Sequence, residues 1–408
     1  MPSSPPLPYH HAVRMFQGDN QNAKASLGVR YRVLGQLDEA SGRSDGRRYS
    51  ASDLIASFSD RYLAELRGQP QALRRAAMGL VDQLQALKQL AERASSGPVV
   101  WTGMGGSYAV CHAPVTELAG RGLQVWMADA AELVDFRRPT LHSNTILVAV
   151  SQSGESAEVV RLVRTLRSQP RGPQVVSVTN GLANRLAAEA DLAFDTRAGD
   201  ELGPSTLTFG NALVVLSALT LVLAGETVDS AVESTRKATD QASNAAEALL
   251  SRHPQLTAEL RAWLGDHSVL ALLGRGSDRA ATEMGSLLLK EAARFPAESL
   301  QTAQFRHGPL ELAGPQTAVA IVATEAVTLE QDQRLAQQLS EDGTAVLVIS
   351  MEGSGPSSAH RLGTGQVQRM LSPAVSVVAF QLLAGALAGE RGYEPCALER
   401  ASKVTAYE

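Results

Sequence analysis

Cysteine, aromatic residues and excess positive charge are all scarce in this chain. The two cysteines, Cys111 and Cys396, match no metal-binding or redox spacing, so no disulfide is required and a cytoplasmic location is expected. Aromatic residues make up 4% of the chain and the formal net charge is −5, which argues against nucleic acid as a partner. The histidines show no spacing typical of zinc ligands, so we expect no metal site.

Long uninterrupted hydrophobic runs and targeting signals are also missing. The longest apolar runs, 212–225 and 374–389, are interrupted by polar residues or glycine and are predicted to be buried helices, so no membrane partner is expected. The N-terminus lacks the basic start and apolar segment of a secretory signal. Residues 1–58 are rich in Pro, Ser, Gly and Arg and are predicted to form a flexible extension.

What the sequence does contain is a strand and helix pattern that occurs twice. Val99–Gly105 and Leu270–Gly276 each form a predicted strand that runs into a glycine turn, and equivalent glycines lie about 171 positions apart. This alternation predicts an α/β fold in which each half is a parallel sheet flanked by helices, as in flavodoxin-like folds. Two helices that break at Pro70 are predicted to precede the first strand. The expected parts are a first domain at 59–245, a second at 246–395 and a C-terminal tail at 396–408.

A hydroxyl-rich turn, Ser151–Ser156 with the sequence SQSGES, is the most informative stretch of the first half. It lies between a predicted buried strand at 145–150 and a predicted helix at 157–166. Such a turn directs backbone N–H groups, hydroxyls and the positive end of a helix dipole at one point, which suits a phosphate dianion. The corresponding stretch of the second half, 324–327, carries a glutamate and no such serines. The alternative is that a serine of this turn only caps the helix.

Candidate proton-transfer residues follow in the second half. Glu291 lies near the end of a predicted helix over 279–293, and His307 lies on a loop with a Gly-Pro pair. A carboxylate and a histidine can act as base and acid. The alternative is that Glu291 is a solvated helix residue and that His307 bonds to backbone. Lys403 is a third candidate, although a lysine near a C-terminus is usually a solvated charge.

Motifs of one family occur along the chain in that family's order. They are Glu65-x-x-x-Gln69-Pro70, Gly105–Tyr108, Ser151–Ser156, Glu201–Phe209, Gly274–Gly276, Lys290–Glu291, Arg306–Pro309 and Ser402–Thr405. Together they resemble the sugar isomerase (SIS) family with two SIS domains, and specifically the isomerase half of glucosamine-6-phosphate synthase and the glucosamine-6-phosphate deaminases. The resemblance covers roughly residues 60–405.

The resemblance implies a phosphorylated hexose or amino sugar as substrate, a set of binding residues and no cofactor. Glu291 would move a proton between C1 and C2 of the open-chain sugar, and Lys403 would lie against that chain. His307 would assist ring opening and reach into a neighbouring subunit's site, so a homodimer or higher homo-oligomer is expected. The implied substrate-binding residues are Gly105, Ser107, Ser151, Gln152, Ser153, Ser156, Ser205 and Ser402.

The chain departs from the family at three supporting positions. Leu288 replaces a lysine three residues before the implied catalytic glutamate, Gln304 replaces a glutamate, and Leu207 replaces the lysine of a Ser-Thr-Lys motif. An altered substrate, lowered activity and a sensor role are therefore all open. No cysteine precedes Cys111, so we do not expect glutamine to be the ammonia source, as it is in the synthase.

The leading expectation is a deaminase and isomerase that converts glucosamine 6-phosphate to fructose 6-phosphate and ammonia. An aldose–ketose isomerase or a fructosamine-type 6-phosphate deglycase would use the same residues and stays open. A non-catalytic sugar-phosphate sensor is the alternative from a different class.

Overall fold

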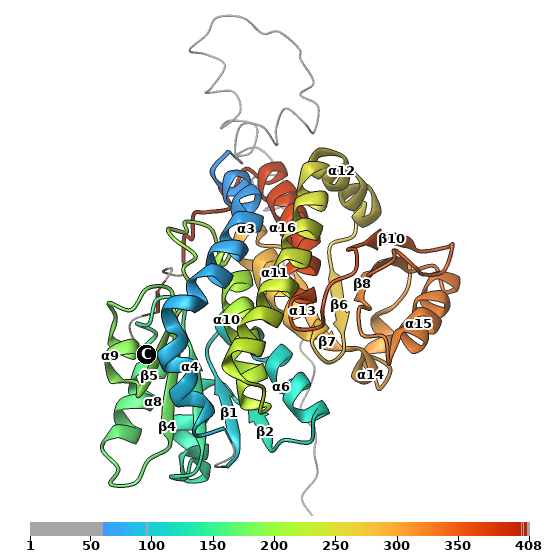
Figure 1. The fold of residues 1–408 in the computed structure, drawn as a ribbon. Coiled ribbons are helices and arrows are strands. Elements are labelled where there is room, and N and C mark those ends of the chain that lie inside the picture. Colours follow the sequence, from blue (N-terminus) through green and yellow to red (C-terminus); the bar gives the residue numbers. More distant parts are fainter. Residues whose placement is uncertain (1–59, 95–96, 401, 403, 406–408) are drawn as a thin grey trace, which may run out of the picture. The chain divides into compact units, whose positions relative to one another are not determined.

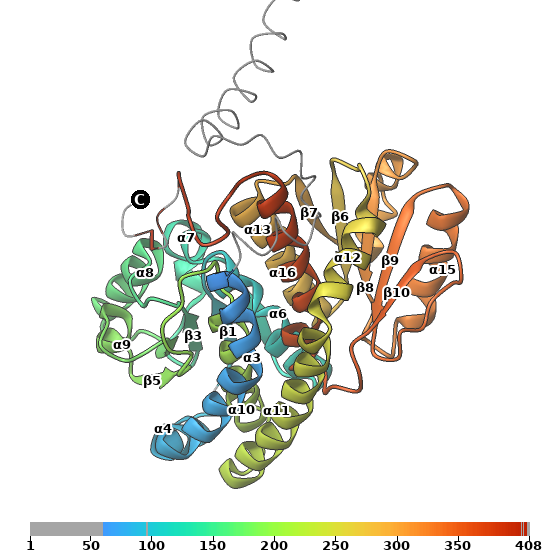
Figure 2. The same ribbon diagram turned by 90° about the horizontal axis from the view of Figure 1, so that it is seen from above.

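The computed structural model describes residues 60–94, 97–400, 402, 404 and 405. The predicted extension at 1–58 and the candidate Lys403 lie outside these described residues. Figures 1 and 2 show the ribbon in two views.

Two separate five-stranded sheets, each with all its strands parallel, form the framework of the described chain. Their strand orders are β2-β1-β3-β4-β5 and β7-β6-β8-β9-β10, so the second sheet repeats the topology of the first. The strands of the first sheet are β1 Val99–Thr102, β2 Val125–Met127, β3 Ile146–Val150, β4 Gln174–Thr179 and β5 Leu192–Asp195. Those of the second are β6 Leu270–Gly274, β7 Ala297–Gln301, β8 Ala318–Val322, β9 Ala345–Ser350 and β10 His360–Gly363. The α/β prediction, with one sheet in each half, is confirmed.

Helices cover both sheets, and the core they form joins the two halves. The buried helices α10 and α16 coincide with the long apolar runs of the sequence, and one hydrophobic cluster includes residues of both helices and both sheets. Smaller clusters cover the other face of each sheet. The larger helices are α3 Asp60–Gly79, α4 Leu84–Ala91, α6 His112–Gly120, α8 Ala157–Arg167, α10 Thr208–Leu223, α11 Val228–Ser251, α12 His253–Leu264, α13 Asp278–Ala293, α15 Leu329–Glu341 and α16 Ser372–Glu390. The shorter ones are η1 Leu80–Gln83, α5 Gly106–Ala109, α7 Ala130–Glu132, η2 Leu133–Arg137, η3 Arg138–Thr140, α9 Arg185–Glu189, α14 Thr302–Phe305 and η4 Pro309–Leu312.

Helix α3 corrects one sequence prediction, because it continues through Pro70 instead of breaking there. A proline inside a helix removes one backbone hydrogen bond, at a cost of about 3 kcal/mol. Packing offsets that loss here: the buried Gln69 donates to the carbonyl of Thr206 at 2.8 Å and to Oε1 of Gln381 at 2.7 Å. The boundary between the two helices lies later, at the 3₁₀ turn η1 that separates α3 from α4.

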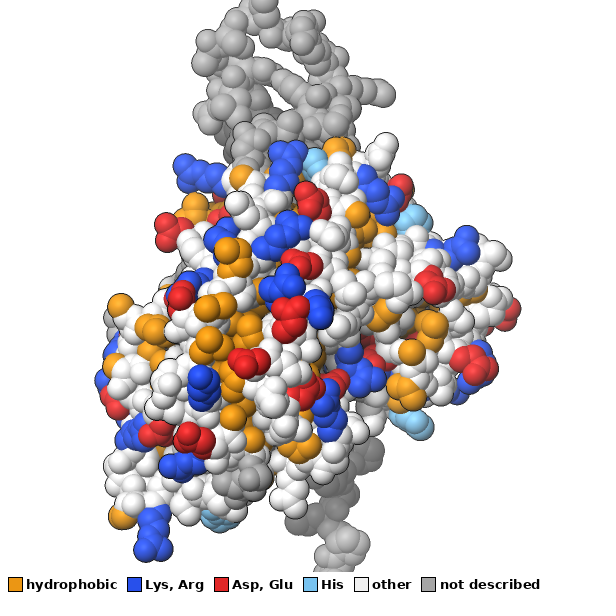
Figure 3. All heavy atoms as spheres, viewed as in Figure 1, with side chains coloured by type: hydrophobic (Ala, Val, Ile, Leu, Met, Phe, Trp, Pro, Cys, Tyr) orange, Lys and Arg blue, Asp and Glu red, His pale blue; other side chains and the backbone are white. Residues whose placement is uncertain are grey.

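Two helices, α16 and α11, connect the two halves through their packing. By length and composition α16 could cross a membrane, yet 94% of its most apolar window is buried inside the protein, as expected of a core helix. Helix α11 runs across residue 245, where we expect the first domain to end, and it packs on α3 and α10 as well as on α16. On the face shown in Figure 3, hydrophobic side chains gather over α3 and α4. Met78 at the end of α3 and Val81 in η1 are exposed.

Candidate functional site

The serine-rich turn lies at the carboxyl edge of the first sheet, where the strand order reverses. Strand β3 ends at Val150 and α8 begins at Ala157, so the turn joins a buried strand to a helix as the sequence predicts. Strand β1, the neighbour of β3, runs into the glycine turn Gly103–Gly105 at the same edge. Open parallel sheets bind their ligands at such a reversal of strand order.

Hydrogen bonds inside this turn leave the start of α8 uncapped by side chains. Ser156 occupies the N-cap position but makes no side-chain capping bond; its Oγ lies 3.1 Å from Oγ of Ser151. Ser151 is buried, and its Oγ also accepts from the N–H of Gly154 at 3.1 Å. Ser153 Oγ accepts from the N–H of Glu155 at 3.1 Å. The alternative that a serine merely caps the helix is therefore wrong. The buried hydroxyl of Ser151 instead holds the turn through its hydrogen bonds to Gly154 and Ser156.

Glycine is required at position 154 of the turn. Gly154 has φ +65°, and a Cβ atom there would lie 2.0 Å from Oδ1 of Asn184. Any side chain would therefore be strained and would clash. Asn184 is itself fixed, because it caps α9 through the N–H of Ala187 at 2.9 Å. The neighbouring Asn184 thus restricts position 154 of the turn to glycine.

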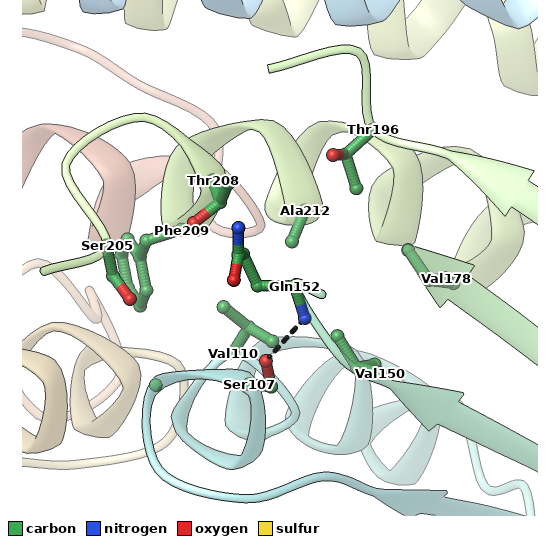
Figure 4. Close-up of a pocket in the computed structure, with 11 residues that line it drawn as sticks. Ser107, Val110, Val150, Gln152, Val178, Thr196, Ser205, Thr208, Phe209 and Ala212 are labelled. Carbon is green, nitrogen blue, oxygen red and sulfur yellow. Dashed lines mark hydrogen bonds between the residues drawn. The ribbon is translucent and has the colours of Figure 1, made fainter. Parts of the chain in front are cut away.

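Two further loops meet the serine turn. Ser107, on α5, accepts from the backbone N–H of Gln152 at 3.3 Å, the dashed line in Figure 4. Ser205 belongs to the loop that precedes α10 and has φ +50°, a left-handed conformation that is uncommon for serine. Figure 4 shows Ser107, Gln152 and Ser205 around a small cavity of about 20 Å³, with Thr208 and Phe209 of α10 above them.

Two carboxylates hold the loop that carries Ser205. Glu65 of α3 accepts from the N–H groups of Leu202 at 2.6 Å and Gly203 at 3.0 Å. Glu201 accepts from the N–H groups of Leu207 at 2.6 Å and Thr208 at 2.8 Å, at the start of α10. Charge-assisted bonds to backbone N–H groups are among the stronger hydrogen bonds in proteins. The strained conformation of Ser205 is therefore maintained by its surroundings.

A larger cavity of about 320 Å³ opens between the first half, α13 of the second half and the C-terminal tail. It contains the expected Gly105, Ser107, Gln152, Ser153, Ser156, Ser205, Glu291 and Ser402 in its lining. Residues that the sequence analysis did not single out as site residues also line it: Met104, Gly106, Glu158, Glu201, Pro204, Leu287, Leu398 and Thr405. Most of these lie within or beside the quoted motifs, so their place in a motif was the signal that could have identified them as site residues. Leu287 could have been found from its position about one helical turn before Glu291.

Glu291 is brought to the cavity by α13, which packs directly on the glycine turn of the first half. A Cβ atom on Gly106 would lie 2.9 Å from Sδ of Met284, so the absence of a side chain there allows the close approach. Burial raises the pKa of Glu291 to about 7. No hydrogen bond or ion pair to its carboxylate is present among the described residues, and Leu288 is fully buried in the core. A carboxyl group in this environment can both accept and return a proton near neutral pH.

The C-terminal tail crosses from the second half to the serine turn. Glu399 pairs with Arg294 at 2.6 Å, Ser402 Oγ donates to the carbonyl of Val404 at 2.6 Å, and the carbonyl of Thr405 accepts from the N–H of Ala157 at 3.0 Å. Ser402 and Thr405 thus lie at the cavity together with the start of α8.

His307 is not brought to this cavity by its own chain. It is exposed, it lies in the loop between α14 and η4, and it does not line the cavity. Gln304 is likewise exposed, whereas Leu207 is buried beside Ala72 and Ala198. A role for His307 therefore depends on a second subunit.

The equivalent position of the second half is filled by a carboxylate. The N–H of Ser277 donates to Oε1 of Glu325 at 3.1 Å, and Nε of Arg369 donates to Oε2 at 2.9 Å. A bound anion would have to displace this buried side chain. Among the described residues, no group of three or more His, Cys, Asp or Glu side chains is placed to hold a metal ion.

Comparisons with known proteins agree with this geometry. Residues 94–222 match the SIS domain family. The chain is 30% identical over 356 residues to a glutamine–fructose-6-phosphate aminotransferase of Symbiobacterium thermophilum, covering 81% of this chain and 56% of the relative. A protein of the same name from Aeropyrum pernix is 29% identical, with 88% of this chain and 59% of the relative covered. The chain thus spans little more than half the length of these relatives.

Solved structures show the same architecture. The C-terminal domain of glucosamine-fructose-6-phosphate aminotransferase from Francisella tularensis has a TM-score of 0.72 and 22% identity, covering 82% of this chain and 97% of that domain. A glucosamine-6-phosphate deaminase from Thermotoga maritima has a TM-score of 0.63 and 20% identity, and the match covers 85% of this chain and 99% of that chain. Residues 94–222 are therefore similar to the SIS domain family, and the two sheets of the chain have the fold of two SIS domains.

Proposed function

We propose that this protein acts on a hexose 6-phosphate and that it converts glucosamine 6-phosphate to fructose 6-phosphate and ammonia. The observation that carries the proposal is the placement of Glu291, with a pKa raised to about 7, in the same cavity as the serine turn at the start of α8. A phosphate anchor and a proton-transfer group in one cavity are what sugar isomerisation requires. The relatives named above support a phosphosugar as the ligand.

The phosphate is proposed to bind at the serine turn. Ser107, Ser153 and Ser156 line the cavity, and the start of α8 adds the positive end of its dipole. No arginine or lysine lines the cavity among the described residues, so hydroxyls and backbone N–H groups would supply the binding. The rest of the sugar would then extend toward Glu291 and the tail.

Glu291 is proposed to transfer the proton. With the ring open, its carboxylate removes the hydrogen on C2 of the amino aldose, which gives an enolamine, and the same carboxyl group returns the proton to C1. The product is a 2-imine of the ketose. Water adds to C2, and the C2–N bond breaks to release ammonia and leave the C2 carbonyl. One water is consumed and no redox change occurs. His307 of a neighbouring subunit would assist ring opening, and Lys403 would hold the open chain.

The test is to incubate the full-length protein with glucosamine 6-phosphate and to measure ammonia and fructose 6-phosphate separately. Both products should form in equal amounts. Glu291→Gln should bind the sugar phosphate like the wild type and lose turnover, because it removes the proton carrier and leaves the serine turn unchanged.

Other outcomes assign a different function. Aldose–ketose interconversion without ammonia would favour an isomerase, and ammonia or amine release only from a fructosamine 6-phosphate would favour a deglycase. Binding of the sugar phosphate with no conversion of any of these compounds would overturn the enzymatic proposal in favour of a sensor.

A further inference from the structure

A partly buried hydrogen bond joins the two halves on the same helix that carries Glu291. Nε2 of His112, on α6 of the first half, lies 2.7 Å from Oε1 of Glu283, on α13 of the second half. The exposed fractions of the two side chains are 9% and 22%. Arg279, one turn earlier on α13, donates to the same carboxylate oxygen at 2.6 Å. Neither His112 nor Glu283 lines the cavity of the proposed active site.

Helical spacing connects this pair to the site. Glu283, Leu287 and Glu291 are four residues apart in succession, so they lie along one face of α13. Leu287 and Glu291 line the cavity, and Glu283 continues the same face toward α6. Eight residues of one continuous α-helix, about two turns, separate Glu283 from Glu291, so we expect a shift at Glu283 to move Glu291 as well.

Within its own half α13 is already fixed. Ser286 Oγ donates to the carbonyl of Ala297 at 2.9 Å, and Gly285 packs against the ring of Phe380. The other contacts of α13 with the glycine turn, those of Met284 and Leu287, are apolar and have no directional preference. The His112–Glu283 bond is directional and charge-assisted, and it sets the register of α13 on the first half.

The charges around Glu283 also favour a fixed contact between His112 and Glu283. Burial would raise the pKa of Glu283, but the hydrogen bond from His112 and the charges of His112 and Arg279 hold that pKa below its ordinary value. Tyr108 and Cys111 face the carboxylate from the first half, and both have raised pKa values because of burial and this negative charge. Glu283 is thus ionised and held by partners on both helices.

We propose that His112 and Glu283 are positioning residues that fix the distance between the serine turn of the first half and the Glu291 carboxylate of the second. The inference rests on the proposed function, in which the phosphate is held by one half and the proton is transferred by the other. The distance from the phosphate to C1 and C2 is set by the sugar, so only one register of the halves suits the reaction. A misplacement of about 1 Å can reduce turnover by about 100-fold.

The test compares His112→Leu, the conservative Glu283→Gln and a control. His112→Leu should lower kcat by about 10-fold to 100-fold with little change in the Kd for glucosamine 6-phosphate. Glu283→Gln keeps an acceptor for His112 but loses the negative charge, so its kcat should fall less than that of His112→Leu. The matched control is Asp332→Asn, which removes the negative charge of the buried pair with Arg275 inside the second half and should reduce stability without this kcat effect.

A second readout does not depend on turnover. The pKa of Glu291 can be measured from its carboxyl carbon by NMR in glutamate-labelled protein and assigned with Glu291→Gln. His112→Leu should lower this pKa toward the ordinary value as α13 shifts and water enters, whereas Asp332→Asn should not. The other acidic groups that line the cavity, Glu158 and Glu201, are the same in every variant.

The outcomes separate the two proposals. If the wild type shows no turnover, the proposed function is refuted. The positioning role of His112 and Glu283 would then be decided by the measured pKa of Glu291 alone. An unchanged kcat and pKa in His112→Leu, or equal losses in Asp332→Asn, would overturn that role. If His112→Leu does not fold, the double variant His112→Leu, Glu283→Leu takes its place, because it also removes the Glu283 carboxylate and leaves only the partly exposed Arg279 without that partner.

Discussion

The backbone N–H of Ala157 donates to the carbonyl oxygen of Thr405 at 3.0 Å. Ala157 is the first residue of α8, directly after the serine turn, and Thr405 lies 15 residues after the end of α16. This bond ties the C-terminal tail to the part of the first half that is proposed to bind phosphate. The tail therefore forms one wall of the cavity, with Leu398, Ser402 and Thr405 in its lining.

Removal of residues 402–408 should abolish turnover and leave the fold intact, since none of the described residues after Cys396 belongs to the hydrophobic core. We expect a loss in kcat of at least about 100-fold, because one wall of the site is missing. Activity assays together with circular dichroism and thermal unfolding check this. A shorter deletion of 406–408 is the matched control and should retain most of the activity. Full activity without 402–408 would show that the tail is dispensable.

Ser153→Asp should prevent stabilisation of the protein by sugar phosphates, because it places a negative charge where the phosphate dianion is proposed to bind. Thermal shift with glucosamine 6-phosphate is the measurement. Ser357→Asp, at an exposed position of the second half, adds the same charge away from the site and serves as the control. Thr324 is unsuitable for this purpose because its hydroxyl bonds to the buried Asp278, whose pKa burial raises to about 7. Retained stabilisation in Ser153→Asp would place the phosphate elsewhere.

Glu291 should make stability fall as the pH rises from the ordinary pKa of about 4.5 to about 7. The native state holds this proton more tightly than the unfolded state, so the native state is disfavoured by deprotonation, and the penalty is complete above pH 7. Glu291→Gln should therefore stabilise the protein near pH 8 by roughly 1–3 kcal/mol and have little effect near pH 4. Urea unfolding at both pH values measures the difference. An equal effect at both pH values would mean that the carboxyl group is not desolvated.

The dependence of kcat on pH offers a second measure of the same group. The carboxylate form of Glu291 has to accept the C2 hydrogen, so kcat should rise with an apparent pKa near 7 and then level off. A rise centred near 4.5 would instead indicate a solvated carboxylate or another base.

Two inactive variants should restore activity when their subunits are mixed. His307 is exposed and absent from the cavity of its own chain, whereas Glu291 lines that cavity. If His307 serves a neighbouring site, mixed oligomers of His307→Ala and Glu291→Gln contain some sites with both native residues. Roughly a quarter of the sites in a random mixture of dimers would be native, so activity should approach that fraction. The mixture is unfolded and refolded together, and each variant alone is the control. A fully active monomer would contradict this prediction.

Much of the architecture followed from local sequence. Buried strands such as Ile146–Val150 are continuous apolar runs, and the glycine turns at Gly103 and Gly274 mark equivalent strand ends, so the repeat and the parallel sheets were predictable. The break at Pro70 was wrongly predicted. Local propensity disfavours proline inside a helix, but the contacts of the adjacent Gln69 with Thr206 and Gln381 come from distant parts of the chain.

The site likewise combines groups that could be predicted from local sequence with contacts that could not. The groups that are available can be identified along the chain: the serine turn, the carboxyl group of Glu291 and the glycines that permit close approach. Which groups meet depends on the packing of the folded chain, which places α13 on the first half, His112 against Glu283, and Glu325 in the second half's equivalent position. These relationships join residues separated by 48 to 182 positions, and they depend on how helices pack across the core. Neither periodicity nor motif spacing carries that information, because both describe neighbours along the chain.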